Sequence, residues 1–234
     1  MKRLIILLSV MMISSAWLYA QTDVSHYQMK FDNFNELKVV DGVNVDYVCD
    51  PSRAGIVEFD APRDLVSAFI FEPTKTKLTI KLTASETPYK DLPTLRVYSS
   101  YLTNVTNDGD SLVRVLSVAE GPKFNCRVTG NGSISVRNVK ANDVSATILA
   151  GKGVIAIYGE CSTANLKVAG AGQIQADELK ASVVSCSSTG VGSIHCYAVE
   201  QLSYGGLSGK IYYRGTPELK KRFLAHVTLV AIDD

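Results

Sequence analysis

A glycine pair recurs at a nearly constant interval through the C-terminal half of the sequence. The motif is Gly-x-Gly with an isoleucine two residues later, and it returns roughly every 20 residues. The pairs are Gly130 and Gly132, Gly151 and Gly153, Gly170 and Gly172, and Gly190 and Gly192. A repeat of this length is too short for a pair of helices and indicates a β-solenoid, in which each repeat forms one coil of a stack.

The isoleucines predict which residues fill the interior of the coils. Alternate residues of a strand point to opposite faces, so each strand contributes to inward columns. After the glycine pairs the predicted columns are Ile134, Ile155, Ile174, Ile194 and Ile211, and then Val136, Ile157, Ala176, Cys196 and Tyr213. Before the pairs they are Val128, Leu149, Val168 and Ser188, and Cys126, Thr147, Leu166 and Cys186.

The glycines are expected to turn the corners, because glycine adopts positive φ without steric cost. Leu112, which follows Gly109, is expected to begin a degenerate first coil.

The N-terminal half reads as short strands with alternating apolar residues. One example follows the turn dipeptide Asp41-Gly42, where Val43, Val45 and Tyr47 share a face. We therefore expect an all-β chain. Residues 21–105 form an N-terminal β region that packs on the solenoid or continues it, and residues 106–234 form the β-solenoid with a C-terminal capping strand.

Residues 1–20 predict a secretory signal peptide. A basic start at Lys2 and Arg3 precedes an apolar run from Leu4 to Ile13, and Ala20 is a small residue at the expected cleavage point. The alternative, a membrane anchor, is disfavoured because the run is too short to span a bilayer comfortably. We expect an exported protein in the periplasm or on the outer surface.

Charge and cysteine content exclude several classes of function. The net charge is +1, so the sequence lacks the dominant basic stripe of a nucleic-acid-binding protein. Its five cysteines form no CxxC pair or Cys/His cluster, and we expect no metal and no cofactor. Cys126 and Cys186 share a column three coils apart, roughly 14 Å by strand spacing, which is too far for a disulfide. Cys186 and Cys196 share a coil and can meet only if their strands face closely, so buried free thiols are expected.

Other uses of the glycine motif fit poorly. Dinucleotide binding needs a helix after the glycines, whereas strands are expected here. Calcium-binding β-rolls need a regular aspartate at the turn, and these turns carry Asn131, Lys152, Ala171 and Val191.

An outward column lies three residues after each isoleucine and is the candidate ligand-binding strip. Tyrosine faces stack on sugar rings, and arginine and aspartate bond hydroxyl groups. The alternative is ordinary packing between neighbouring coils. The column is Arg137, Tyr158, Asp177, Tyr197 and Arg214.

The enzyme alternative is a polysaccharide lyase or hydrolase built on a β-helix. Glycoside hydrolysis needs two carboxylates on one face, roughly 5–10 Å apart. Carboxylates are few in the coils, and the adjacent Asp177 and Glu178 face opposite sides of a strand. We assign no catalytic residue. A periplasmic structural or sensory domain is a third alternative.

The order of these motifs resembles the head GIN domain family of auto-transporter adhesins. The resemblance rests on the opening from Phe34 to Val45, the Gly-x-Gly-x-Ile coils, and the closing run from Ile211 to Pro217. It implies a right-handed β-helix, export in a Gram-negative bacterium and no established catalytic residues. From the outward column we expect a glycan or a surface protein as partner. The family's coils often read Gly-Ser-Gly-Asp/Ser-Ile, and here only Ser133 and Ser193 keep the small polar residue.

Overall fold

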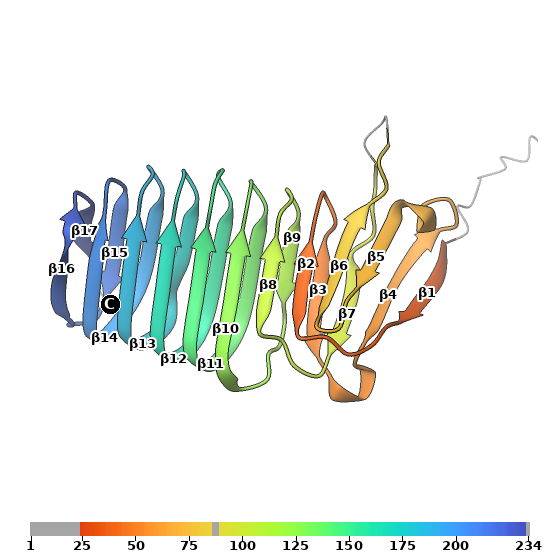
Figure 1. Ribbon diagram of the computed structural model, residues 1–234, viewed down its shortest axis with the longest axis horizontal. Helices are drawn as coiled ribbons and strands as arrows, with labels where there is room; N and C mark the ends of the chain where they lie inside the picture. Colours follow the sequence, from red (N-terminus) through yellow and green to blue (C-terminus); the bar gives the residue numbers. More distant parts are fainter. Residues whose placement is uncertain (1–23, 86–88, 233–234) are drawn as a thin grey trace, which may run out of the picture.

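The computed structural model describes residues 24–85 and 89–232, which form one elongated stack of β-coils (Figure 1). The predicted signal peptide lies outside the described residues. Among these residues, no helix is long and apolar enough to span a membrane. Two 3-10 turns interrupt the strands, η1 (Pro51–Arg53) and η2 (Val66–Ala68).

The first nine strands are short. They are β1 (Val24–Lys30), β2 (Glu36–Val39), β3 (Val45–Cys49), β4 (Ile56–Pro62), β5 (Phe69–Pro73), β6 (Lys77–Leu82), β7 (Leu95–Ser99), β8 (Asn104–Asn107) and β9 (Leu112–Val115). The later strands are mostly longer. They are β10 (Gly121–Val128), β11 (Ser133–Ile148), β12 (Val154–Val168), β13 (Gln173–Ser188), β14 (Ser193–Gly206), β15 (Lys210–Arg214), β16 (Glu218–Ala225) and β17 (Thr228–Ala231).

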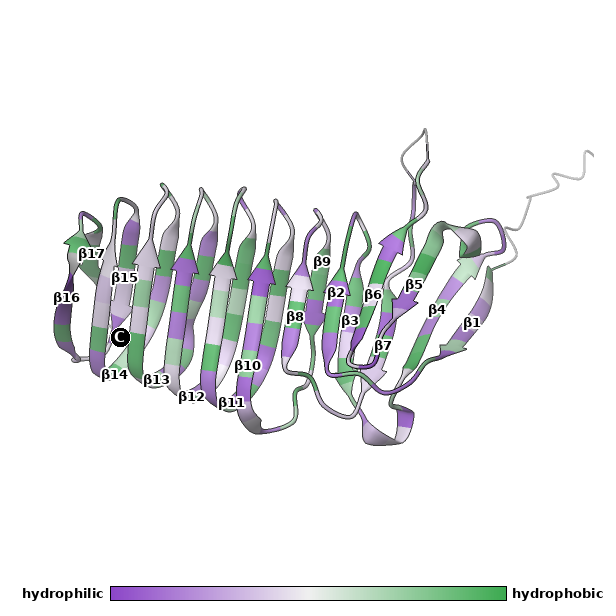
Figure 2. Cartoon of the chain, viewed as in Figure 1, coloured by the Kyte–Doolittle hydropathy of each residue, from purple (hydrophilic) through white to green (hydrophobic). Residues whose placement is uncertain are grey.

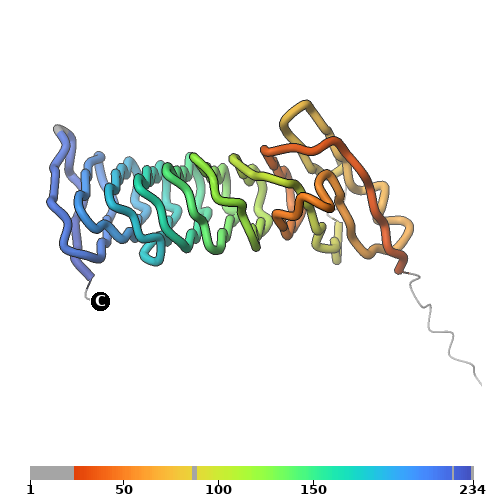
Figure 3. Tube along the Cα trace, turned by 90° about the horizontal axis from the view of Figure 1, so that it is seen from below, coloured from red at the N-terminus to blue at the C-terminus, as the bar shows by residue number. Residues whose placement is uncertain are grey.

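Each coil contributes one strand segment to each of two faces, and Figure 3 shows the coils side by side along the long axis. We call one the groove face. It consists of β6, β2, β8 and β10, the second halves of β11 to β14, and β16. We call the other the tyrosine face. It consists of β7, β3 and β9, the first halves of β11 to β14, β15 and β17. Strands within both faces are parallel, so the predicted β-solenoid with coils about 20 residues apart is confirmed.

The order of coils in space differs from their order in the sequence. The β2–β3 coil lies between the β6–β7 coil and the β8–β9 coil, because β2 pairs with β6 and β8 while β3 pairs with β7 and β9. Beyond β7, the antiparallel strands β1 and β4 extend the stack at its N-terminal end, and β5 lies antiparallel to β6. The predicted division between residues 105 and 106 falls within β8, which belongs to the continuous stack.

The interior consists of the predicted inward columns, with three corrections. Ile134, Ile155, Ile174, Ile194 and Ile211 are all buried and lie in register, and polar and apolar bands alternate along the strands (Figure 2). The structure places Ile148 and Ala146 where Leu149 and Thr147 were predicted, and Leu149 is 46% exposed. The reason is that the turn after Ile148 contains one residue more than the equivalent turns after β10, β12 and β13. In the first coil, Val113 takes the predicted place of Leu112.

The turn glycines serve two different purposes. Gly130, Gly151 and Gly170 have positive φ, as predicted for a corner. The second glycine of each pair does not, and neither does Gly190. At those positions the preceding coil leaves no room: a Cβ added to Gly172 would lie 2.5 Å from the carbonyl oxygen of Gly153, and one on Gly192 would lie 2.3 Å from that of Gly172. Glycine is required there by close stacking of backbones.

The cysteines are free, and three of them are buried. Cys186 and Cys196 meet across the interior, where the Cys186 thiol donates to Cys196 Sγ at 3.8 Å. This hydrogen bond and burial together raise the pKa of the Cys186 thiol. The equivalent positions one coil earlier are Leu166 and Ala176, and one coil before that they are Ala146 and Ile157. Large side chains therefore alternate between the two faces, and two medium-sized thiols fill the same space.

This size compensation predicts the effect of cysteine replacement. Cys186→Leu together with Cys196→Ala copies the preceding coil and should leave the free energy of unfolding within ~1 kcal/mol of the original. Cys186→Leu alone overfills the interior and should cost ~1–3 kcal/mol. Urea unfolding of both variants measures the difference. If the double variant is no more stable than Cys186→Leu alone, the two sites do not compensate each other.

The glycine stacking predicts a loss of stability that strain in φ does not explain. Gly172→Ala places its Cβ against the Gly153 backbone and should lower the free energy of unfolding by more than ~2 kcal/mol. Gly42→Ala is the matched control, because its Cβ meets nothing within 4 Å and should change stability by less than ~1 kcal/mol. Urea denaturation midpoints at equal m-value compare the two. Equal effects would contradict the stacking argument.

Candidate binding surfaces

The tyrosine face carries one outward row that crosses the C-terminal coils. The row consists of the residues that follow the isoleucine column, and they pair in register from coil to coil: Ser135, Ala156, Gln175, His195 and Tyr212. The rings of His195 and Tyr212 stack with centroids 4.5 Å apart. Burial lowers the pKa of His195, while the charge of Asp177 opposes that shift. A neutral imidazole and a tyrosine ring thus form a flat aromatic surface at neutral pH.

The five residues of the predicted strip do not form one continuous row. Tyr197 pairs in register with Arg214 in the next coil. Tyr158 lies opposite Glu178 rather than Asp177, because the register shifts after Ala156. Arg137 is exposed at a bend where the pairing of β11 with β12 is interrupted, and it has no register partner.

Unequal bends explain this interruption. Between the inward residues that flank each bend, the chain advances eight residues from Val136 to Val144, seven from Ile157 to Ala164, eight from Ala176 to Val184 and six from Cys196 to Leu202. Asn138 and Gly159 take positive φ at the first two bends. Counting a fixed number of residues from each isoleucine therefore loses the register once the strand enters the bend.

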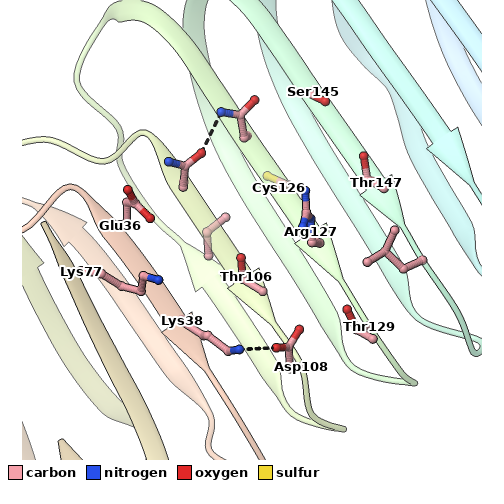
Figure 4. A pocket seen from close by; sticks show the side chains of 14 residues that line it. Glu36, Lys38, Lys77, Thr106, Asp108, Cys126, Arg127, Thr129, Ser145 and Thr147 are labelled. Carbon is pink, nitrogen blue, oxygen red and sulfur yellow. Dashed lines mark hydrogen bonds and ion pairs between the residues drawn. The ribbon is translucent and has the colours of Figure 1, made fainter. Parts of the chain in front are cut away.

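A groove of about 680 Å³ lies on the groove face, across β2, β6, β8, β10 and β11 (Figure 4). Its lining is mostly polar. Lys38 forms an ion pair with Asp108 at 2.7 Å, and the Asn125 amide donates to Asn104 Oδ1 at 2.7 Å. Glu36, Lys77 and Arg127 also line the groove and add charge to it.

The outward residues of this face form two in-register rows. We call the first the amide row, and it consists of Asn104, Asn125, Ser145, Asn165 and Ser185. We call the second the cation row, and it consists of Lys38, Thr106, Arg127, Thr147, Lys167 and Ser187. Along the cation row, cations and hydroxyl groups alternate from one coil to the next.

Sequence reasoning did not find either row. The groove brings together residues from β2 and β8, which are about 70 positions apart in the sequence, and the first of them lie in a coil inserted out of sequence order. A weak signal was present in the asparagine or serine that precedes each glycine pair and is followed two residues later by a cation or a hydroxyl residue.

Charges at the N-terminal end of the tyrosine face neutralise one another. Glu58, Arg96, Asp46 and Arg114 follow in register across β4, β7, β3 and β9. Arg114 donates two hydrogen bonds to Asp46, at 2.6 and 2.7 Å, and this contact raises the pKa of Arg114. Burial alone would raise the pKa of Glu58, but hydrogen bonds from Tyr98 and Arg53 outweigh it and lower that pKa. These charged groups form ion pairs and hydrogen bonds with one another, which stabilise the fold.

The described residues offer little for catalysis. They contain no group of three or more His, Cys, Asp or Glu side chains placed to hold a metal ion. Burial raises the pKa of the half-buried Cys161 thiol to about 12, so it remains protonated at neutral pH. His26 contacts Asp60 at 2.8 Å and His195 stacks on Tyr212, so each is engaged by a neighbour.

Comparisons with known proteins agree with this architecture. The chain is similar over 90% of its length to 94% of a "putative adhesin" from Bacteroides fragilis NCTC 9343, with a TM-score of 0.79 and 20% identity. It is similar over 91% of its length to 98% of a "putative adhesin" from Parabacteroides distasonis ATCC 8503, with a TM-score of 0.74 and 19% identity. A "putative lipid binding protein" from the same strain gives a TM-score of 0.69 at 17% identity, covering 91% of this chain and 98% of that one.

At these identities the solved structures establish the fold alone. No functionally curated protein matches the sequence. The family model described as "Putative auto-transporter adhesin, head GIN domain" matches residues 33–217, which include the coils of both faces. The chain therefore belongs to the head GIN domain family of auto-transporter adhesins.

Proposed function

We propose that this protein is an exported, non-catalytic adhesin of the bacterial cell envelope that binds a glycan or a surface protein through the outside of its solenoid. Membership of the adhesin family supports adhesion, and the signal-peptide pattern of residues 1–20 supports export. The names of the family and of its structural neighbours denote adhesion or lipid binding, and none denotes an enzyme.

The observation that carries this proposal is the in-register stacking of outward side chains on flat parallel sheets. Successive coils repeat at about 4.8 Å, so each outward row presents one side chain per coil along a straight line. Such a row matches an extended ligand better than a compact one, because an extended ligand meets an equivalent contact at every coil.

The aromatic part of the tyrosine face is the surface we propose for sugar rings. Tyr197 and Tyr212 lie on neighbouring coils, Tyr158 lies two coils before Tyr197, and His195 extends the flat surface by stacking on Tyr212. Arg214, in register with Tyr197, supplies hydrogen-bond donors beside the rings. The proposed strip therefore no longer includes Arg137 and Asp177, and within it only Tyr197 and Arg214 pair in register.

Labelling of intact cells tests the location. A membrane-impermeant amine reagent should modify exposed lysines such as Lys140, Lys152 and Lys167 on intact cells, read by mass spectrometry. Labelling that appears only after the outer membrane is opened would contradict direct adhesion and favour a periplasmic structural or sensory role.

Substitution of the tyrosines tests the surface. Tyr158→Ala with Tyr197→Ala should weaken binding to a glycan identified on an array by at least ~10-fold, because two ring contacts are lost. Tyr158→Phe with Tyr197→Phe is the matched control, and it keeps the rings and should retain most of the affinity. The circular dichroism spectra of both variants should match the original. Unchanged binding by the alanine variant would remove this face from the proposal.

A further inference from the structure

The groove face presents cations at a regular interval that the tyrosine face does not share. Lys38, Arg127 and Lys167 lie in the cation row on every second coil, so neighbouring cations are ~10 Å apart by strand spacing. Thr106, Thr147 and Ser187 supply hydroxyl groups on the intervening coils. From Lys38 to Ser187 the row crosses five strand steps, or ~24 Å.

Most cations of this face have no acidic partner. Lys77, Lys123, Arg127 and Lys167 form no ion pair with any residue that the structure describes, and Arg127 and Lys167 are exposed. The exceptions are Lys38, which is paired with Asp108 at 2.7 Å, Lys81, which is paired with Glu72 at 2.5 Å, and Lys220 of β16, which is paired with Glu218 at 3.5 Å. Further along the same face, β16 adds Lys220 and Arg222, and the Arg222 guanidinium donates to Ser185 of the amide row.

The acidic groups on this face lie beside the cation row and do not interrupt it. They are Glu36, Asp108, Asp143 and Glu218, and none of them replaces a cation or hydroxyl position in the row. On the tyrosine face, by contrast, Arg114 is held by Asp46, and Arg96 lies 3.9 Å from Glu58. Unpaired cations therefore lie in a straight, regularly spaced row on the groove face.

We propose that the cation row binds a linear anionic polysaccharide that runs across the coils, at a site separate from the tyrosine surface. Carboxylates of the polymer contact Lys38, Arg127 and Lys167, since charge-assisted hydrogen bonds to carboxylates are the strong ones. Sugar hydroxyls contact Thr106, Thr147 and the amide row, whose asparagines both donate and accept. This inference rests on the proposed role as an envelope binding protein and assigns a second ligand class to it.

The geometry favours a polysaccharide over other polyanions. The face is flat and polar and runs straight, and the groove has exposed apolar surface only near Leu149, so it offers no apolar insertion into a lipid bilayer. Hydroxyl and amide groups between the cations match a polymer that carries hydroxyl groups between its charges. Vesicles and duplex DNA serve as the competing classes in the test.

The probe is polygalacturonate, with uncharged dextran as its control. The full mature chain should bind polygalacturonate and not dextran in a titration at low salt, and the affinity should fall as salt rises because exposed charges are screened. Galacturonate oligomers should bind more tightly as their length approaches the span of the row, since longer oligomers reach more than one cation.

Two charge-neutralising double variants separate the row from net charge. Arg127→Gln with Lys167→Gln should weaken polygalacturonate binding by at least ~10-fold and reduce its salt dependence. Lys140→Gln with Lys210→Gln removes the same charge at exposed positions away from the groove face and should change affinity by less than ~2-fold. Equal losses in the two variants would overturn the proposal, because binding would then follow net charge alone.

The remaining outcomes are also decisive. If vesicles containing phosphatidylglycerol or a duplex DNA bind more tightly than polygalacturonate and lose affinity in the row variant, the site belongs to that other class and the inference is wrong. If none of these polyanions binds, the inference is again wrong. In either case the proposed function survives as long as the tyrosine variants still lose affinity for a glycan on the array.

Discussion

Close stacking of backbone on backbone is the constraint on which the rest of this molecule depends. At the turns, the amide of Gly192 donates to the Gly170 carbonyl at 3.0 Å, and Ser193 donates to Gly172 at 3.1 Å. The glycine columns lie so close together that an added methyl group would overlap the previous coil. Because every coil is fixed to its neighbour in this way, inward and outward side chains fall into straight columns, and both proposed binding surfaces follow from that alignment.

Polar residues inside the stack show what this alignment demands. Asn107 is fully buried in a column that otherwise contains Val128, Ile148 and Val168, and its amide donates to the carbonyls of Ser111 and Ser133 while its oxygen accepts from Gly109. The Asn107 side chain thus links the turn at Gly109 and Ser111 to Ser133 in the next coil by hydrogen bonds. Ser188 occupies the same column farther along, and its hydroxyl has no hydrogen-bond partner among the described residues. A small side chain is needed at this position, because Gly206 and Gly209 pack closely against Ser188.

The sequence predicted those features that depend on local counting. Counting from the isoleucines located the inward columns because each isoleucine stands two positions after the last glycine of its turn, as Ile134 does after Gly132. Counting failed where lengths vary: the longer turn after Ile148 displaced Leu149, and the unequal bends separated Arg137 and Asp177 from Tyr197. It could not reach the groove, because Lys38 and Thr106 become neighbours through pairing of distant strands. Where strands distant in the sequence pair, as β2 does with β8, the register is set by the packing of whole coils, and no constant interval in the sequence marks it.

The two faces of the stack carry side chains of different chemistry. At the N-terminal end of the tyrosine face the charged side chains pair with each other, as Asp46 does with Arg114, and aromatic rings lie on the C-terminal coils. On the groove face most cations have no acidic partner among the described residues, and polar groups lie between the cations of the cation row. Neither face needs to reorganise to meet an extended ligand, because the hydrogen-bonded coils already hold the side chains in line, and preorganisation reduces the entropic cost of binding. The stack can therefore discriminate between ligands by the face on which they bind and by the interval at which their charged or ring-shaped units recur.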